Sequence, residues 1–88
     1  MKQNFYNRET VTKNFLGSYS SMRLYENRLV FVNTLTDEEV CILGYKDTLK
    51  QIADALQVGV EDDVILALFA SCNSDDCFAL LLQKGMVE

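Results

Sequence analysis

The chain has 88 residues, 49% of them hydrophobic, and a formal net charge of −5. This length predicts a single domain over residues 1–88. The acidic balance argues against general binding of nucleic acid or of anionic membranes, because both interactions need an excess of Lys and Arg. No membrane span is expected, since the longest apolar run, 64–70, is far shorter than the ~20 residues that a spanning helix needs.

The charge is unevenly distributed along the chain. Residues 1–28 carry five basic and two acidic groups, a balance of +3, whereas residues 29–88 carry three basic and eleven acidic groups, a balance of −8. Such a split fits a charge pattern that faces a partner. A solvated surface with chance clustering explains it equally well, so both interpretations stay open.

The N-terminal segment, 1–20, is ambiguous. Val11, Phe15 and Leu16 form one side of a short helix that Gly17 would end, whereas 10–15 alternates as a strand does. The helix is the interpretation that we favour.

Residues 22–45 predict a β-meander. The runs 22–25, 28–32 and 39–43 are rich in apolar and β-branched residues, and the first two flank the polar pair Glu26-Asn27, which is typical of a hairpin. The runs 29–32 and 40–43 are nearly continuous in apolar residues. We therefore expect a three-stranded antiparallel sheet with one face covered by helices and the other partly buried as well.

The helical part is expected over residues 47–85. A first helix has its apolar residues spaced for one side, with Asp47 as N-cap and Gly59 as terminator. A second helix begins at 61–63 and a third begins at Ser74 and stops at Gly85. The fold class that follows is α+β, a three-stranded antiparallel β-meander packed against two or three C-terminal α-helices. The apolar positions of the first helix are Leu49, Ile52, Ala53 and Leu56.

The residues that usually carry catalysis or bind metal are scarce. There is no histidine, the three cysteines Cys41, Cys72 and Cys77 do not match a zinc site, and the four glycines are isolated. Two carboxylate clusters fall where helix N-termini favour negative charge. The sequence therefore predicts no enzyme and no catalytic, metal or cofactor residues. An odd number of cysteines without a leader-like N-terminus favours reduced thiols in the cytoplasm.

The stretch 49–60 locally resembles the helix and turn of helix-turn-helix regulators. The resemblance covers less than a quarter of the chain, and it implies that the following helix would read the major groove of DNA. That helix begins Glu61-Asp62-Asp63, and phosphates would repel three carboxylates there. Binding of nucleic acid is therefore not the expected function.

Two groups of residues are candidates for contacts with a protein partner. Aromatic and basic side chains are interleaved in the first third of the chain, and such residues are common at binding hot spots. The acidic cluster at 61–63 would speed association with a basic partner. The candidates are Tyr6, Tyr19, Arg23, Tyr25, Glu61, Asp62 and Asp63.

The C-terminal half holds more apolar side chains than one small sheet is expected to cover. Exposed apolar patches mark interfaces, so this surplus predicts a homodimer formed through the second and third helices; the alternative is that all of these residues fit into one monomeric core. The predicted dimer residues are Val64, Ile65, Leu68, Phe69 and Leu81.

These observations favour a small acidic non-enzymatic protein that binds a macromolecular partner. Proteins of this size and composition are common among inhibitors and adaptors, including those of viruses and mobile elements, and that analogy rests on composition alone. Two alternatives stay open: a small helix-turn-helix-like DNA-binding regulator, and a dimer that binds a small molecule or nucleotide with its aromatic and basic N-terminal third.

Overall fold

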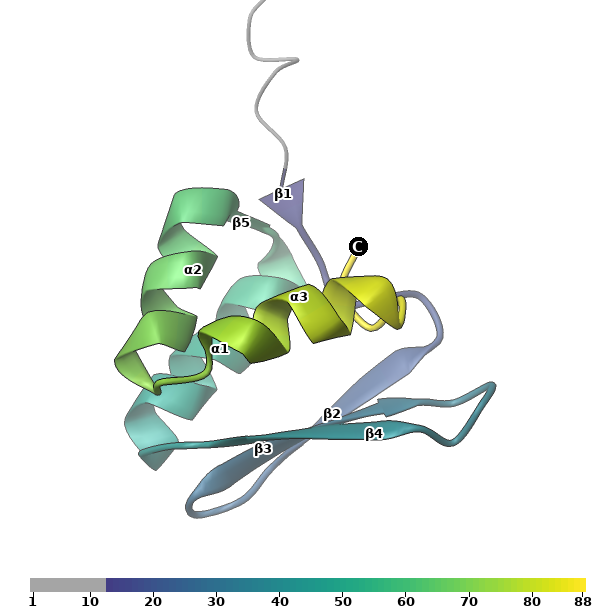
Figure 1. Cartoon of the computed structure of the whole chain (residues 1–88), viewed down its shortest axis with the longest axis horizontal. Helices are drawn as coiled ribbons and strands as arrows, with labels where there is room; N and C mark the ends of the chain where they lie inside the picture. Colours follow the sequence, from purple (N-terminus) through teal and green to yellow (C-terminus); the bar gives the residue numbers. More distant parts are fainter. Residues whose placement is uncertain (1–12) are drawn as a thin grey trace, which may run out of the picture.

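The computed structural model describes residues 13–88 and has an α+β architecture, as predicted (Figure 1). A three-stranded antiparallel sheet in the order β2-β3-β4 is followed by three helices, and a second, two-stranded sheet joins β1 to β5. The elements are β1 (Lys13–Asn14), β2 (Ser20–Leu24), β3 (Arg28–Asn33), β4 (Glu39–Leu43), α1 (Lys46–Val58), β5 (Val60–Glu61), α2 (Asp62–Ser71) and α3 (Asp75–Gln83).

Strict alternation of burial in β3 and β4 gives the meander an inner and an outer face. Successive side chains of a strand point to opposite faces, and here Leu29, Phe31, Val40 and Ile42 are buried while their neighbours are half-buried or exposed. Phe31 pairs with Val40, and Leu29 pairs with Ile42. These four side chains form the floor of the core.

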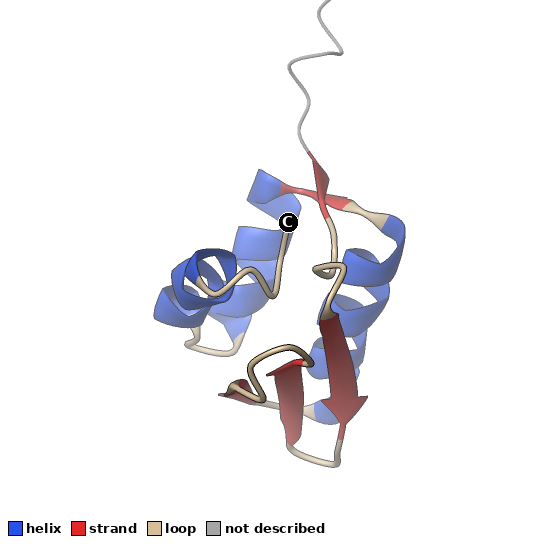
Figure 2. Cartoon of the chain, turned by 90° about the vertical axis from the view of Figure 1, so that its right-hand side faces the viewer, coloured by secondary structure: helices blue, strands red, loops and turns tan. Residues whose placement is uncertain are grey.

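All three helices lie on the inner side of the meander (Figures 1 and 2). The apolar side of α1 is buried at the positions that its spacing predicted, and α2 and α3 add Phe69 and Phe78, whose rings meet edge to face at 5.3 Å. Fully burying one such side chain contributes roughly 1.5–3 kcal/mol. The helices therefore supply the upper half of a single core.

The N-terminal prediction is corrected by the structure. Lys13 and Asn14 form a strand that pairs with Glu61 and Val60, so the favoured helix is wrong over these two residues and the strand alternative is right. The buried Asn14 side chain explains the preference, because its Nδ2 donates hydrogen bonds to the Val60 carbonyl (3.1 Å) and to Asp62 Oδ1 (2.6 Å). The part of the prediction that concerns Val11 lies outside the described residues.

The helix ends follow the sequence signals closely, with one error. Helix α1 begins after Tyr45, so Asp47 lies in its first turn and is not the N-cap. There it still places negative charge at the positive end of the helix. Gly59 ends α1 with φ +97°, as predicted, and Ser74 is the N-cap of α3.

The end of the chain completes the core, which no sequence signal predicted. Phe15 and Glu88 exchange backbone hydrogen bonds of 2.8 and 2.7 Å, and Gly17 N donates to the Met86 carbonyl at 2.8 Å. Met86 is fully buried, and Val87 nearly so. The segment that leads into β2 is thus held between the C-terminal residues and α1.

Gly17→Ala tests the close approach of the backbone at Gly17 to the backbone at Gly85, which we call the crossing. A Cβ at Gly17 would meet the backbone carbonyl oxygen of Gly85, which no side-chain rotation can relieve. We expect a loss of about 1–3 kcal/mol in the free energy of unfolding, measured by urea titration. The neighbouring Ser18→Ala, at an exposed position, should change it by less than about 0.5 kcal/mol. Equal stability of the two variants would contradict the crossing.

The substitutions Ile65→Val and Val64→Ala test which side of α2 faces the core. Ile65 is fully buried and should lose about 0.5–1.5 kcal/mol of unfolding free energy with one methyl group. Val64 is 49% exposed, so the larger truncation to Ala, which also favours the helix, should cost less. The reverse order in thermal or urea unfolding would show that α2 is rotated from the described position.

Candidate protein-interaction surface

The face of the meander that points away from the helices has no element of residues 13–88 packed over it (Figure 2). We call it the outer sheet face. It is formed by alternate residues in register across the three strands. Row by row across β2, β3 and β4, its residues are Ser21, Val32 and Glu39; Arg23, Val30 and Cys41; Tyr25, Arg28 and Leu43.

Basic and aromatic side chains are concentrated at one end of the outer sheet face. The guanidinium carbon of Arg28 lies 4.4 Å from the centroid of the Tyr25 ring, a cation–π contact. Arg23 is exposed in the neighbouring row, and no ion pair to either arginine occurs among residues 13–88. Glu39 is the single acid on the face, so the outer sheet face carries a balance of +1 in a chain of −5.

Large apolar side chains are exposed along β4 and its two ends. Leu43 is 64% exposed in the strand, Leu35 is 68% exposed in the preceding turn, and Tyr45 is 86% exposed just after the strand. Such residues are commonly buried, and here all three lie beside one strand. Of the three, Leu43 lies on the outer sheet face, which also includes Val30 and Val32.

Within residues 13–88, no backbone group pairs with β4 on the side away from β3. Asn33 N donates to the Glu38 carbonyl, and Gly44 N donates to the Asn27 carbonyl. Hydrogen-bonded pairs alternate in an antiparallel ladder, so Val40 and Ile42 also bond to β3. The N–H and C=O groups of the outward residues, Glu39, Cys41 and Leu43, therefore point away from the sheet.

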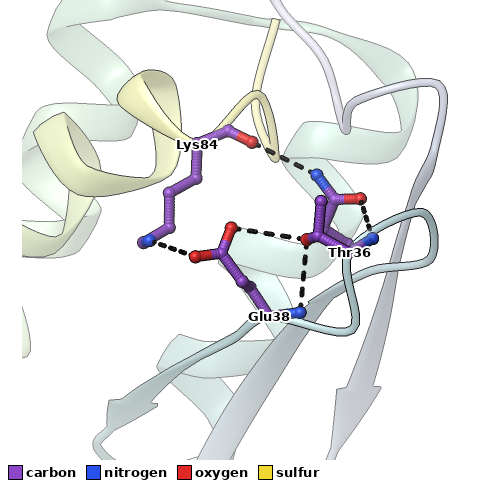
Figure 3. Close-up of polar contacts among 4 residues, drawn as sticks. Thr36, Glu38 and Lys84 are labelled. Atoms are coloured by element: carbon purple, nitrogen blue, oxygen red, sulfur yellow. Dashed lines mark hydrogen bonds and ion pairs between the residues drawn. The ribbon is translucent and has the colours of Figure 1, made fainter.

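An ion pair joins the end of α3 to the start of β4 (Figure 3). Lys84 Nζ lies 2.9 Å from Glu38 Oε2, and the Thr36 hydroxyl donates to Glu38 Oε1 at 3.3 Å. The Lys84 ammonium, through its hydrogen bond and its charge, holds the pKa of Glu38 below the usual 4.5. In addition, Asn33 Nδ2 donates to the Lys84 carbonyl at 3.3 Å. These contacts fix α3 over the β3–β4 turn.

The predicted acidic site at 61–63 is engaged in local structure. Asp62 accepts the bond from Asn14, and Asp63 Oδ1 accepts from the Val64 N–H at 2.9 Å. Strand β1 pairs with β5 directly before α2. The helix-turn-helix resemblance would require the N-terminus of α2 to enter a DNA groove. This end of α2 is acidic and lies beside β1, and both features disfavour such insertion.

The predicted dimer interface needs a correction. Ile65, Phe69 and Leu81 are fully buried within one chain, because they fill the core above the sheet. They are therefore unavailable to a second copy. Of the five predicted residues, Val64 is exposed and Leu68 is partly buried. The core therefore absorbs three of the five, while Val64, Leu66, Leu80 and Leu82 remain exposed on α2 and α3.

The structure brings together part of the aromatic and basic group predicted from the sequence. Arg23 and Tyr25 lie on the outer sheet face, and Tyr19 is exposed in the turn before β2, whereas Tyr6 lies outside the described residues. Arg28 and Leu43 were not selected from the sequence. The alternation within 28–32 and 39–43 could have found both, since it assigns them to the same face as Arg23.

Within residues 13–88 no group of three or more Cys, Asp or Glu is placed to hold a metal ion. A polar depression beside α2 and α3 is lined by Ala70, Asn73, Asp75 and Asp76. None of the helices described in residues 13–88 has both the length and the apolar content needed to cross a bilayer.

No family model, no curated protein and no solved structure matches the chain. A proposal of function therefore rests on the surface of the described residues.

The Glu38–Lys84 ion pair predicts a specific pH dependence. Because the pKa of Glu38 is lowered by folding, its contribution is present above pH 4.5 and is lost as the pH falls through the lower folded value. In thermal unfolding, wild type should lose more stability on acidification than Glu38→Gln. Lys84→Gln should flatten the profile similarly, and the double variant should add nothing. Parallel profiles for wild type and Glu38→Gln would contradict the pair.

Proposed function

We propose that this protein is a small non-enzymatic interaction protein that binds a protein partner through its outer sheet face. One observation carries the proposal: a three-stranded sheet buries one face and leaves arginine, tyrosine and aliphatic side chains in register on the other. Tyr and Arg are enriched at hot spots because they combine apolar area with polar groups.

Charge favours an acidic surface on the partner. Arg23 and Arg28 have no carboxylate partner among residues 13–88. Their guanidinium groups suit bidentate bonds to the carboxylates of a partner. The rest of the chain is strongly acidic and would repel an acidic partner that approached elsewhere. This contrast directs the partner to one face.

The proposed role is that of an inhibitor or adaptor. The protein would act in the cytoplasm and would be encoded by a virus or a mobile element. All three cysteines are unpaired, which suits a reducing compartment. The viral assignment rests on analogy of size and composition. The proposed binding does not require a homodimer, because the outer sheet face belongs to one chain.

Charge reversal tests the proposal. Tagged wild-type protein, Arg23→Glu and Arg28→Glu are used to capture proteins from lysate, and recovery is quantified by mass spectrometry. The arginine variants should recover at least about tenfold less of the protein that wild type enriches, since losing one hot-spot residue costs ≥ ~2 kcal/mol.

Lys50→Glu is the matched control. Lys50 is exposed on α1 and pairs with Asp54 at 3.0 Å, so its reversal makes the same change in net charge away from the outer sheet face. It should leave recovery of the partner unchanged. If all three variants recover equally less partner, the loss is due to net charge, and the proposed surface is contradicted. If the arginine reversals leave recovery unchanged, the proposed surface is also contradicted.

A further inference from the structure

We infer that the free edge of β4 accepts an extended segment of the protein partner, which adds to the meander as a fourth strand beside β4. This inference rests on the proposed function, since the added strand would continue the outer sheet face. It specifies how the partner is bound: through backbone hydrogen bonds to Glu39, Cys41 and Leu43 and through side-chain contacts on both sides of the sheet.

The backbone of β4 is prepared for this pairing. The three outward residues each present an N–H and a C=O in one line, at the spacing of an antiparallel ladder. An antiparallel strand centred opposite Cys41 forms a hydrogen-bonded pair with each of them. A five-residue strand shifted from this register leaves at least one of the three unpaired.

The edge carries few of the features by which proteins usually prevent such pairing, and Glu39 is the single charged residue within the strand. Protected edges carry Lys, Pro or a bulge, or are covered by another element. Strand β4 is Glu-Val-Cys-Ile-Leu, pairs with β3 without a bulge, and shows the burial pattern of a one-sided strand. The exposed Leu35, Leu43 and Tyr45 lie along the same edge and at its ends.

The position of α3 over β4 favours pairing of β4 with a single added strand and disfavours its pairing with β4 of a second copy of this chain. Helix α3 lies over β4 on the inner side (Figures 1 and 2). In a symmetric β4–β4 pair, two helices about 10 Å wide would have to lie over strands only about 4.8 Å apart. A single added strand brings no helix, so it meets no such conflict beside β4.

The chemistry of the edge fixes the kind of segment. Residues opposite Val40 and Ile42 face inward and must be apolar, because these two side chains are buried. A residue opposite Glu39 is favoured as a cation, and one opposite Leu43 as an anion, since Arg28 lies in the same row on β3. Read from its N-terminus, the segment is acidic, apolar, neutral, apolar, basic.

A peptide of this pattern is the probe. Capped Gly-Glu-Val-Thr-Val-Lys-Gly is titrated to millimolar concentration into the full-length, ¹⁵N-labelled protein, followed by NMR. The amides of Glu39, Cys41 and Leu43 should shift and exchange more slowly with solvent. Those of Val40 and Ile42 are already bonded to β3 and should change less, which gives an internal control. Absence of binding at millimolar peptide would overturn the inference.

Two comparisons sharpen the result. The peptide with Glu and Lys exchanged should bind roughly two- to tenfold more weakly, because it places like charges opposite Glu39. Cys41→Pro removes one outward N–H without breaking the β3 ladder and should weaken binding, whereas Cys41→Ser should not. Equal binding of both peptides, or full binding by a folded Cys41→Pro, would overturn strand addition at this edge.

The outcomes separate this inference from the proposed function. If the peptide fails to bind while a protein is captured in an Arg23- and Arg28-dependent way, the outer sheet face stands and strand addition falls. If the peptide binds the β4 edge but no protein is captured, strand addition stands and the proposed partner surface falls. If Cys41→Pro does not fold, the amide-exchange pattern and the exchanged peptide still decide the question in the wild-type protein.

Discussion

The structure depends on one constraint: the helices that follow the meander cover only one of its faces. The four inward residues of β3 and β4 are buried against the helices, and each contributes roughly 1.5–3 kcal/mol when fully buried. No element of residues 13–88 packs over the other face (Figure 2). The outer sheet face therefore follows from the same packing that forms the core, and the strand order β2-β3-β4 places β4 at an edge of the sheet.

The segments around the meander close this core from the side. Residues 15–17 lie between the last three residues of the chain and α1, and Asn14 ties β1 to the start of α2. The Glu38–Lys84 pair holds the C-terminal end of α3 near the β3–β4 turn. These contacts fix α3 over β4, so they also determine what can approach the edge of the sheet.

The sequence predicted the elements whose signals are local. The apolar runs located the meander, and the spacing of Leu49, Ile52 and Leu56 located the buried side of α1. The pairing of β1 with β5 and of 15–17 with 86–88 was missed, because a strand of two residues has no period to detect. These contacts join residues more than forty positions apart, so no local pattern encodes them.

The candidate site was predictable only in part, because some of its residues are brought together by strand pairing and not by a local pattern. Arg23 and Tyr25 were found by residue type, but Arg28 and Leu43 needed the register of the strands to place them on the same face. The predicted dimer residues failed on Ile65, Phe69 and Leu81 because α2 is apolar on nearly all sides. Its periodicity therefore does not show which side faces the core.

Hydroxyl-radical footprinting of the free protein and of its complex with the captured partner tests the central claim most directly. The claim is that the uncovered side of the meander, and not the exposed side of α2, receives the partner. The account predicts that Tyr25 and Leu43 lose reactivity in the complex while Val64 and Leu66 keep theirs. Protection of Val64 and Leu66, with Tyr25 and Leu43 still reactive, would contradict it.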